Sequence, residues 1–216
     1  MARIITIDGP AGTGKSTVSR GVADRLEMPH LDTGAYYRAA TLLALREGVD
    51  IADGSSLARL VRSVFLDQVD GRMLVDGEDV SVEIRTPPVN GAVSEVSAHP
   101  EVREALVEQQ RAWVELHGGA AVVEGRDIGS VVFPNASLKI YLDARPEERA
   151  RRRALQTGEP TEAVLADQER RDGFDSSRAL SPLSVPPGAH VIDTSDLSLG
   201  QVVERILGLA GPDSAG

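Results

Sequence analysis

The sequence predicts an α/β protein in which a parallel β-sheet is flanked by helices and a small β-meander is inserted. Three observations indicate this fold class. Short apolar segments alternate with segments of helical periodicity along most of the chain. A glycine-rich loop joins the first apolar segment to the first helical one. Two Asp-Gly pairs lie close together in the first half of the chain.

The first strand and the first helix enclose the glycine-rich loop. Residues Ile4–Asp8 form a short apolar run that predicts a buried strand. Val18, Val22 and Leu26 recur at every fourth position and predict a helix over residues 17–26.

A second strand and helix follow directly. We expect a strand at His30–Asp32 and a helix over residues 35–46. Asp32 or Thr33 can cap the start of this helix, and Gly48 can end it.

The two Asp-Gly pairs predict a meander. They are Asp70–Gly71 and Asp76–Gly77, each between apolar residues and both after a short helix expected over residues 55–64. An Asp-Gly pair is a strong signal for a two-residue hairpin loop. We expect three strands, near residues 64–69, 72–75 and 78–82. The meander differs from the alternating pattern around it and is therefore interpreted as an insertion. The alternative is a surface sheet without a functional role.

The second half of the chain returns to alternating strands and helices. Residues 86–88 are expected to break the chain, and a long helix is expected from Pro100 to about residue 116. The remaining strands lie in the segments AAVVEGRD, LKIYLDA and HVIDT. The remaining helices cover PEERARRRALQ, residues 161–171 and residues 199–209.

The glycine-rich loop carries the first functional signal. It matches the Walker A pattern G-x-x-x-x-G-K-[ST] at Gly9, Gly14, Lys15 and Ser16. A loop that leads into a helix directs free N–H groups and the positive end of the helix dipole at phosphates. This predicts a nucleoside triphosphate site, against the alternative of a chance match in an ordinary glycine-rich turn. We expect the phosphates to contact Gly9, Gly12, Thr13, Gly14, Lys15, Ser16 and Thr17.

Composition restricts the classes of function. The formal net charge of −10 makes the chain a poor general binder of nucleic acid, whose phosphates favour a basic protein face. With no Cys there is no disulfide, thiol chemistry or Cys-ligated metal. An apolar run long enough to span a membrane is lacking, and the first strand begins too early for a signal peptide. We expect a cytoplasmic, monomeric enzyme with neither a nucleic-acid nor a membrane partner.

Further motifs distinguish between classes of nucleotide-binding protein. A regulatory GTPase requires a guanine-reading N-K-x-D motif, which the sequence lacks. A large ATPase or motor usually has adjacent acids after a hydrophobic strand, whereas KIYLDA ends in the single acid Asp143. A small kinase that transfers the γ-phosphoryl group to a small acceptor remains.

Charged residues just after predicted strands point to the acceptor, because ligands of parallel sheets bind at the carboxyl ends of the strands. Arg38 and Arg126 lie in such places, and Arg178 follows farther on. Arginine matches phosphate oxygens bidentately, so these residues together favour an anionic acceptor. Taken singly, each arginine is better explained as a solvated surface charge in this arginine-rich chain, so the argument depends on their joint placement. A nucleoside monophosphate attacks through an oxygen that is already anionic and needs no general base, whereas a sugar or alcohol acceptor benefits from one.

Six segments closely resemble the bacterial cytidylate kinases, a family of nucleoside-monophosphate kinases with a P-loop. They are IDGPAGTGKST, LDTGAYYRA, GEDVSVEIRTPPVNGAVSEVSAHPEVREAL, EGRDIGSVVFPNASLKIYLDA, EERARRR and DSSRALSPL. The resemblance extends from Ile4 to about residue 209. It implies the reaction of ATP with CMP or dCMP to give ADP and CDP or dCDP, with Mg²⁺. It also implies a core over residues 1–33, 118–145 and 188–210, an acceptor-binding region over residues 34–117 with the meander at 64–82, and a mobile lid over about residues 146–180.

The resemblance implies roles for individual residues in binding the acceptor. Thr33 stands where the family often has Ser, in contact with the acceptor, and Arg38 and Arg126 match arginines that bind its phosphate. A second group matches the residues that read cytosine: Ser94, Arg103 and Asp127. A third group matches contacts to the sugar, and to the phosphate or base: Arg171, Asp175 and Arg178.

The donor side of the expected site combines the loop with the lid. Lys15 is expected to neutralise the β and γ oxygens of ATP, and Ser16 to hold Mg²⁺ directly or through water. Arg149 and Arg153 are four residues apart on one helix face and are expected to contact the γ-phosphate, although both can instead be solvated surface charges. The alternative functions are a kinase for another acceptor, such as UMP or a small metabolite, and a slow nucleotide-dependent switch.

Overall fold

The structure is a computed structural model that describes residues 3–176 and 183–211. The chain forms two compact units. The first consists of Met1–His30 and Gly119–Gly216, and the second of Leu31–Gly118. Within the described residues, no helix has the length and apolar character needed to cross a membrane.

A five-stranded sheet with strand order β2-β6-β1-β7-β8 organises the first unit, although only His30 of β2 belongs to that unit. Its strands are β1 (Ile4–Asp8), β2 (His30–Asp32), β6 (Ala121–Gly125), β7 (Leu138–Asp143) and β8 (His190–Asp193). β1 pairs in parallel with β6 and β7, and β7 pairs in parallel with β8. The predicted α/β class is therefore confirmed. Because parallel strands end at the same edge, the loops after β1, β6 and β7 lie close to one another.

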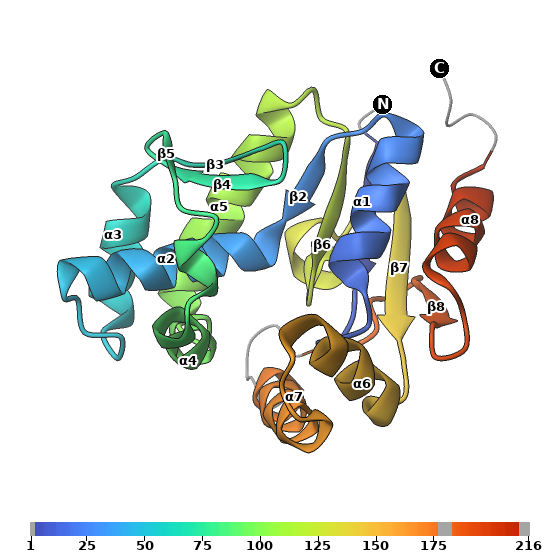
Figure 1. Cartoon of the computed structure of the whole chain (residues 1–216). Helices are drawn as coiled ribbons and strands as arrows, with labels where there is room; N and C mark the ends of the chain where they lie inside the picture. The colour runs from blue at the N-terminus through green and yellow to red at the C-terminus, as the bar shows by residue number, and fades with distance from the viewer. Residues whose placement is uncertain (1–2, 177–182, 212–216) are drawn as a thin grey trace. The chain divides into compact units, whose positions relative to one another are not determined.

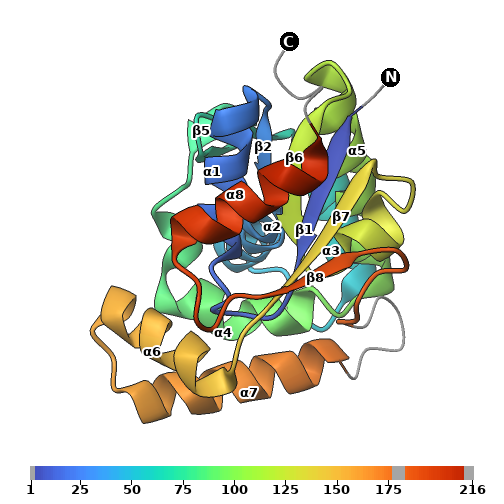
Figure 2. The same ribbon diagram turned by 90° about the vertical axis from the view of Figure 1, so that its right-hand side faces the viewer.

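Helices α1 (Lys15–Leu26) and α8 (Leu199–Ala210) cover one face of this sheet, as Figure 2 shows for α8. Their apolar side chains and those of the strands form one buried core: Ile5, Ile7, Val18, Val22, Ala23, Val122, Ile140, Leu142, Ile192, Val202, Val203 and Ile206. The valines of α1 that predicted the helix are among these residues. This packing fixes the start of α1 relative to the end of β1, and so fixes the loop between them.

Two helices lie at the carboxyl end of β7 (Figure 1). They are α6 (Pro146–Thr157) and α7 (Thr161–Ser176), which pack against each other. Pro146 begins α6, where its missing N–H costs nothing, and Gly158 ends it with a φ of 75°. α7 is five residues longer than the expected helix over residues 161–171.

The second unit contains four α-helices, a 3₁₀-helix and a small sheet among its described residues. The helices are α2 (Thr33–Glu47), α3 (Gly54–Arg62), α4 (Pro87–Val96) and α5 (Pro100–Leu116), with the 3₁₀-helix η1 at Glu83–Arg85. The small sheet consists of β3 (Leu66–Val69), β4 (Arg72–Val75) and β5 (Glu78–Asp79), paired antiparallel in the order β3-β4-β5. The Asp32 side chain caps α2 by accepting from the Ala35 N–H at 3.1 Å.

The meander is confirmed, and its turns explain the Asp-Gly signal. Asp70 and Gly71 have φ values of 52° and 74°, and Asp76 and Gly77 have values of 48° and 85°. Positive φ at both central residues is the type I′ geometry that suits the twist of a two-residue hairpin. The third strand ends at residue 79 rather than 82 because the Asp79 carboxylate accepts from the N–H and hydroxyl of Ser81 in a local turn.

The expected break at residues 86–88 is confined to Thr86, whose extended backbone separates η1 from α4. Pro87 and Pro88 occupy the first turn of α4. Proline is tolerated there because the first N–H groups of a helix have no partner within the helix. The two prolines thus begin an element that the sequence pattern did not reveal.

Candidate active site

The Walker A residues form a continuous loop between β1 and α1. Two glycines are required by close contacts as well as by backbone angle. A Cβ at Gly9 would lie 2.1 Å from the Leu142 carbonyl oxygen, and one at Gly12 would lie 2.6 Å from the Gln168 side-chain nitrogen. Gly14 is the N-cap of α1 with a φ of 87°. Side chains at Gly9 and Gly12 would collide with these atoms, and Gly14 is favoured by its backbone angle alone, so the glycines allow the loop backbone to follow this path.

Lys15, the first residue of α1, folds back over the loop. Its Nζ donates to the Pro10 carbonyl oxygen at 2.7 Å, and the Thr13 hydroxyl donates to the same oxygen at 3.1 Å. Burial and the nearby Arg126 lower the pKa of Lys15 to about 8, although Glu124 and Asp172 oppose this. The loop therefore holds a partly desolvated cation, whose charged form a bound anion stabilises.

The hydroxyl of Ser16 donates to Glu124 Oε2 at 2.8 Å. His30 Nε2 lies 3.1 Å from the other oxygen of this carboxylate and 2.9 Å from the Ser19 hydroxyl. Burial raises the pKa of Glu124, but its contact with His30 and the charges of His30 and Lys15 outweigh this and hold the pKa below its usual value. Because the Ser16 proton points at a buried carboxylate, lone pairs of Ser16 Oγ remain for a cation.

Glu124 was not among the predicted site residues. It is the first acid of the segment VVEGRD, in which the prediction selected only Arg126 and Asp127. Its position at the carboxyl end of β6, next to β1, was the available signal. Mg²⁺ in nucleotide enzymes is usually bound by one or two protein oxygens together with substrate phosphates. Ser16 and Glu124 fit that donor set.

Asp8 fixes the turn that carries Arg126 and Asp127. Its carboxylate accepts from the N–H groups of Ile128 and Gly129, both at 2.8 Å. Burial raises the pKa of Asp8 to about 6, with a smaller contribution from Asp127, although the two N–H groups and Lys15 oppose the rise. The turn after β6 is thereby attached to the end of β1, where the Walker A loop begins.

Asp172 of α7 contacts both the Walker A loop and α6. One of its oxygens accepts from the Ala11 N–H at 3.3 Å and from Arg126 Nη1 at 3.2 Å. Its other oxygen accepts from Arg149 Nη1, which also donates to the Ala11 carbonyl oxygen at 2.9 Å. Two of the predicted phosphate-binding arginines, Arg126 and Arg149, therefore meet at the loop. Asp172 was missed, although it stands beside Arg171 in the segment ERRDGFDSSR.

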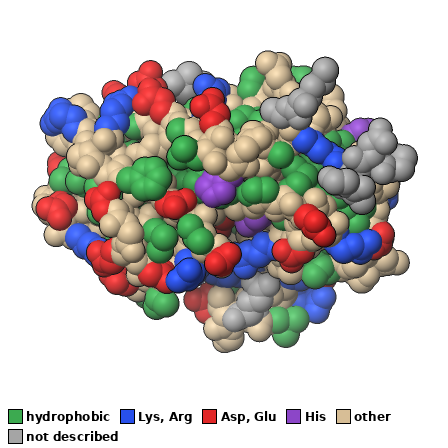
Figure 3. Space-filling view, turned by 90° about the horizontal axis from the view of Figure 1, so that it is seen from above, with side chains coloured by type: hydrophobic (Ala, Val, Ile, Leu, Met, Phe, Trp, Pro, Cys, Tyr) green, Lys and Arg blue, Asp and Glu red, His purple; other side chains and the backbone are tan. Residues whose placement is uncertain are grey.

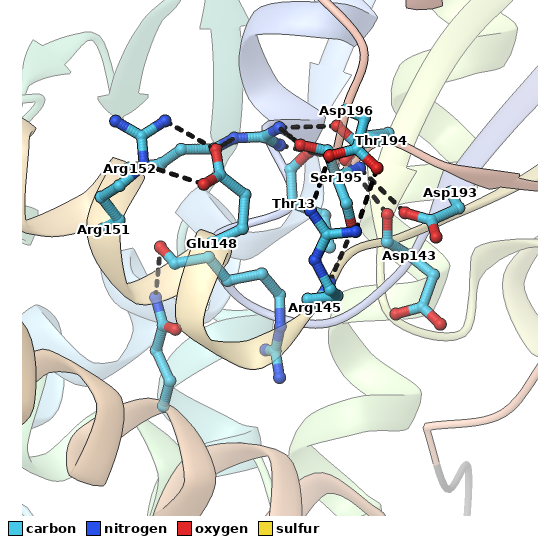
Figure 4. Close-up of polar contacts among 12 residues, drawn as sticks. Thr13, Asp143, Arg145, Glu148, Arg151, Arg152, Asp193, Thr194, Ser195 and Asp196 are labelled. Carbon is cyan, nitrogen blue, oxygen red and sulfur yellow. Dashed lines mark hydrogen bonds and ion pairs between the residues drawn. The ribbon is translucent and has the colours of Figure 1, made fainter.

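The two predicted lid arginines differ in environment. Arg149 is 7% exposed and lies against the loop, whereas Arg153 is exposed. Between them, Arg152 donates to the hydroxyl and the carbonyl oxygen of Thr194 at 3.0 and 2.6 Å, and to Glu148 at 2.9 Å (Figure 4). Arg152 thus attaches α6 to the segment after β8. The four-residue spacing of Arg149 and Arg153 did not show that the first contacts the Walker A loop while the second faces solvent.

The predicted acceptor residues of the second unit lie on three helices. Thr33 and Arg38 belong to α2. Thr33 is buried, and Arg38 Nη1 donates to the Ile84 carbonyl oxygen at 3.1 Å and to the side-chain oxygen of Asn90 at 2.5 Å. Asn90 lies on α4, the helix that the sequence pattern did not predict, and so was not anticipated as a partner of Arg38.

Ser94 and Arg103 are each hydrogen-bonded to Ser97, which lies between α4 and α5. Arg103 is buried and donates to the Ser97 carbonyl oxygen at 3.3 Å, and its guanidinium lies 5.4 Å from the centre of the Tyr37 ring. The Ser97 hydroxyl donates to the Ser94 carbonyl oxygen at 3.0 Å. Aromatic and guanidinium groups close together suit a flat polar ring such as a nucleobase.

Three predicted sugar or phosphate contacts are not placed by the structure. Arg171 and Asp175 lie on α7, but their side chains are not described. Arg178 falls outside the described residues.

Surface charges away from the loop are mixed in sign. On the face shown in Figure 3, basic side chains lie among acidic and uncharged ones. Among the described residues, arginines form surface ion pairs such as Arg46 with Glu78 at 2.9 Å and Arg62 with Glu104 at 3.3 Å.

Comparisons with known proteins agree with the geometry. The family model described as cytidylate kinase matches residues 5–211. A cytidylate kinase from Rhodococcus opacus (strain B4) is 50% identical over 213 residues, covering 94% of this chain and 93% of that protein. One from Mycobacterium leprae (strain Br4923) is 49% identical over 211 residues, covering 95% and 94%.

Solved structures resemble the fold at low sequence identity. An uncharacterized protein from Eubacterium ventriosum ATCC 27560 matches with a TM-score of 0.57 at 12% identity, covering 97% of this chain and 98% of its own. TT1252 from Thermus thermophilus matches with a TM-score of 0.51 at 23% identity, covering 99% and 98%.

Proposed function

Because this chain belongs to the cytidylate kinase family, and is therefore a phosphotransferase, we propose that it transfers the γ-phosphoryl group of ATP to CMP and dCMP, giving CDP and dCDP. The observation that carries the proposal is the meeting of Lys15, Arg126 and Arg149 at the Walker A loop. Phosphoryl transfer requires positioning and charge neutralisation rather than covalent chemistry from the protein. Cations around a loop of N–H groups supply both.

The donor half of the mechanism uses the loop. Backbone N–H groups between Gly9 and Gly14 bind the ATP phosphates, and the Lys15 ammonium neutralises the β and γ oxygens. Ser16 and Glu124 hold Mg²⁺, which when bound neutralises further charge on these oxygens. Arg149 stabilises the charge that spreads over the transferring group, and Arg153 reaches it when the lid closes and excludes water.

The acceptor half uses arginines and no general base. Arg38 and Arg126 bind the CMP phosphate, whose oxygen is already anionic at neutral pH. Thr33 contacts the acceptor as well. The remaining contacts are proposed for the sugar and phosphate: Arg171, Asp175 and Arg178.

Cytosine is selected by the direction of its hydrogen bonds. It presents an amino donor beside a ring-nitrogen acceptor, and uracil presents the reverse. The Asp127 carboxylate and the Ser94 hydroxyl can accept from the amino group, and Arg103, which can only donate, suits the ring nitrogen. With uracil these groups would remain unpaired, at about 1–3 kcal/mol each.

Steady-state kinetics with a panel of acceptors tests the proposal. ADP formation from MgATP is measured with CMP, dCMP, UMP, AMP and small alcohols, and without any acceptor. We expect CMP and dCMP to give the highest kcat/KM, at least about a hundredfold above UMP. A higher value for another acceptor would assign a different kinase activity, and acceptor-independent ADP formation would favour a nucleotide-dependent switch.

We further propose that the enzyme acts as a monomer in the cytoplasm.

A further inference from the structure

We propose that the Asp172 carboxylate occupies the place of a phosphate group in the unliganded enzyme and is displaced when nucleotide phosphates bind. The inference rests on the proposed function. Its starting point is the set of donors around the carboxylate. Asp172 accepts from the Ala11 N–H at 3.3 Å, from Arg126 at 3.2 Å and from Arg149.

Amide and guanidinium donors of this kind bind phosphate. The mechanism proposed above already assigns each of these three donors to a phosphate of the donor or the acceptor. Ala11 lies within the Walker A loop, Arg126 follows β6, and Arg149 belongs to the lid helix α6. A carboxylate and a phosphate both offer anionic oxygens to amide and guanidinium donors. A terminal phosphate group carries a charge of about −1.5 to −2 at neutral pH, more than a carboxylate, so it can replace Asp172 at the same donors.

The arrangement around Asp172 also leaves buried polar atoms unsatisfied. Among the described residues, Arg149 Nε and Gln168 Oε1 are buried and have no hydrogen-bond partner. Gln168 is one turn before Asp172 on α7, and its Nε2 donates to the Arg149 carbonyl oxygen at 3.3 Å. Unpaired buried polar groups are unfavourable, so a rearrangement of α6 and α7 on phosphate binding can improve their pairing.

Displacement makes Asp172 a competitor of the ligand. The contacts that it forms stabilise the unliganded protein and are lost in the complex, so they weaken phosphate binding. Removing the charge of Asp172 should therefore destabilise the free protein and tighten binding. A residue that served only the stability of the fold would lower the melting temperature without tightening binding.

The test uses Asp172→Asn, which keeps the side-chain shape and removes the charge. The matched control is Asp167→Asn, because Asp167 lies on the same helix and pairs with Arg170 at 2.7 Å on its surface. The unchanged protein and both variants are titrated with inorganic tripolyphosphate by calorimetry, without CMP. We expect Asp172→Asn to bind about tenfold more tightly than the unchanged protein, the effect of losing one charged competitor, and the control to bind within about twofold.

Each other outcome overturns the inference. Unchanged binding would mean that Asp172 does not stand in the place of the phosphate, and weaker binding would mean that it holds the arginines toward the phosphate. Absence of binding in both proteins would also contradict it. If the asparagine variant does not fold, the same titration is made with Asp172→Ser, whose side chain is smaller and equally neutral. The same tighter binding is expected. Because tripolyphosphate binding does not depend on the acceptor, failure of this inference is distinguishable from failure of the acceptor panel.

Discussion

Replacing Lys15 by methionine should abolish turnover and, at the same time, stabilise the unliganded protein. Methionine retains the length and the apolar stem of the lysine and removes its charge. The two consequences have one cause, because the partly desolvated ammonium at the Walker A loop is held there for the nucleotide. The substitution therefore separates the cost of Lys15 to the stability of the fold from its benefit to catalysis.

The magnitude follows from the pKa of Lys15. That pKa falls from 10.5 to about 8 in the folded protein, chiefly through burial. A difference of this size corresponds to about 3 kcal/mol of destabilisation while the unfolded chain is fully protonated. Methionine also loses the hydrogen bond to Pro10, worth about 1 kcal/mol, but the Thr13 hydroxyl still donates to that oxygen. The net stabilisation at pH 7 is therefore about 2 kcal/mol.

The pH dependence of the free energy of unfolding tests whether Lys15 destabilises the folded protein. Because the folded-state pKa lies below the unfolded value, the unfolded state binds more protons between about pH 8 and 10.5, and the stability of the unchanged protein rises through that window. The advantage of Lys15→Met should thus be complete below pH 8 and vanish as the pH approaches 10.5. Loss of a cation at the transferring phosphate should lower kcat by about 10³-fold or more.

The assay combines thermal melts over a pH series with turnover measurements. At neutral pH we expect the melting temperature of Lys15→Met to rise by about 4–8 °C. The control is Lys139→Met, which removes the other of the two lysines, one that donates to Pro187 at 3.3 Å. It should change stability by less than about 0.5 kcal/mol. An unchanged or lower melting temperature for Lys15→Met at every pH would refute the argument from charge burial, and near-normal turnover would show that this loop is not the catalytic phosphate site.

Three further predictions concern the base, the metal and nucleic acids. Asp127→Ala should reduce kcat/KM for CMP far more than for UMP and lower their ratio from about a hundredfold toward one, whereas an equal loss for both would remove Asp127 from base reading. Glu124→Gln should raise the Mg²⁺ concentration for half-maximal activity by about 10- to 100-fold while Glu204→Gln, at a surface pair with Arg25, leaves it unchanged. If both variants have the same Mg²⁺ dependence, Glu124 has no part in holding the metal. Titration of labelled oligonucleotides at physiological salt should show no binding, and tight, salt-sensitive binding would contradict the inference from the acidic composition.

The parts of the fold that depend on local sequence were predictable. The Walker A loop and the two Asp-Gly hairpins each require glycine for a backbone angle, and that requirement is visible in the sequence. The periodic valines of α1 likewise identified a helix that packs on the sheet. In each case a few adjacent residues determine the conformation.

The missed features depend on residues that are distant in sequence. Glu124 and Ser16 are separated by 108 positions, and Asp172 and Ala11 by 161. No periodicity within a segment shows such contacts, because the tertiary fold creates them. The start of α4 was missed for a different reason: prolines usually end regular structure, and only their position in the first turn makes them compatible with a helix.

The strand order has a consequence for synthesis on the ribosome. β1 lies between β6 and β7, and Ile4 pairs with Ala121, 117 residues further along the chain. At a translation rate of about 5–20 residues per second, the edge of β1 that pairs with β6 waits about 6–23 s for its partner. The edge that pairs with β7 waits slightly longer, because Leu138 follows its partner Ile5 by 133 residues. The intervening residues Leu31–Gly118 form a compact unit from one contiguous stretch, so they can close during this interval. An apolar strand with free edges is meanwhile open to pairing with other chains, so slow translation between residues 31 and 120 should favour aggregation of the nascent protein.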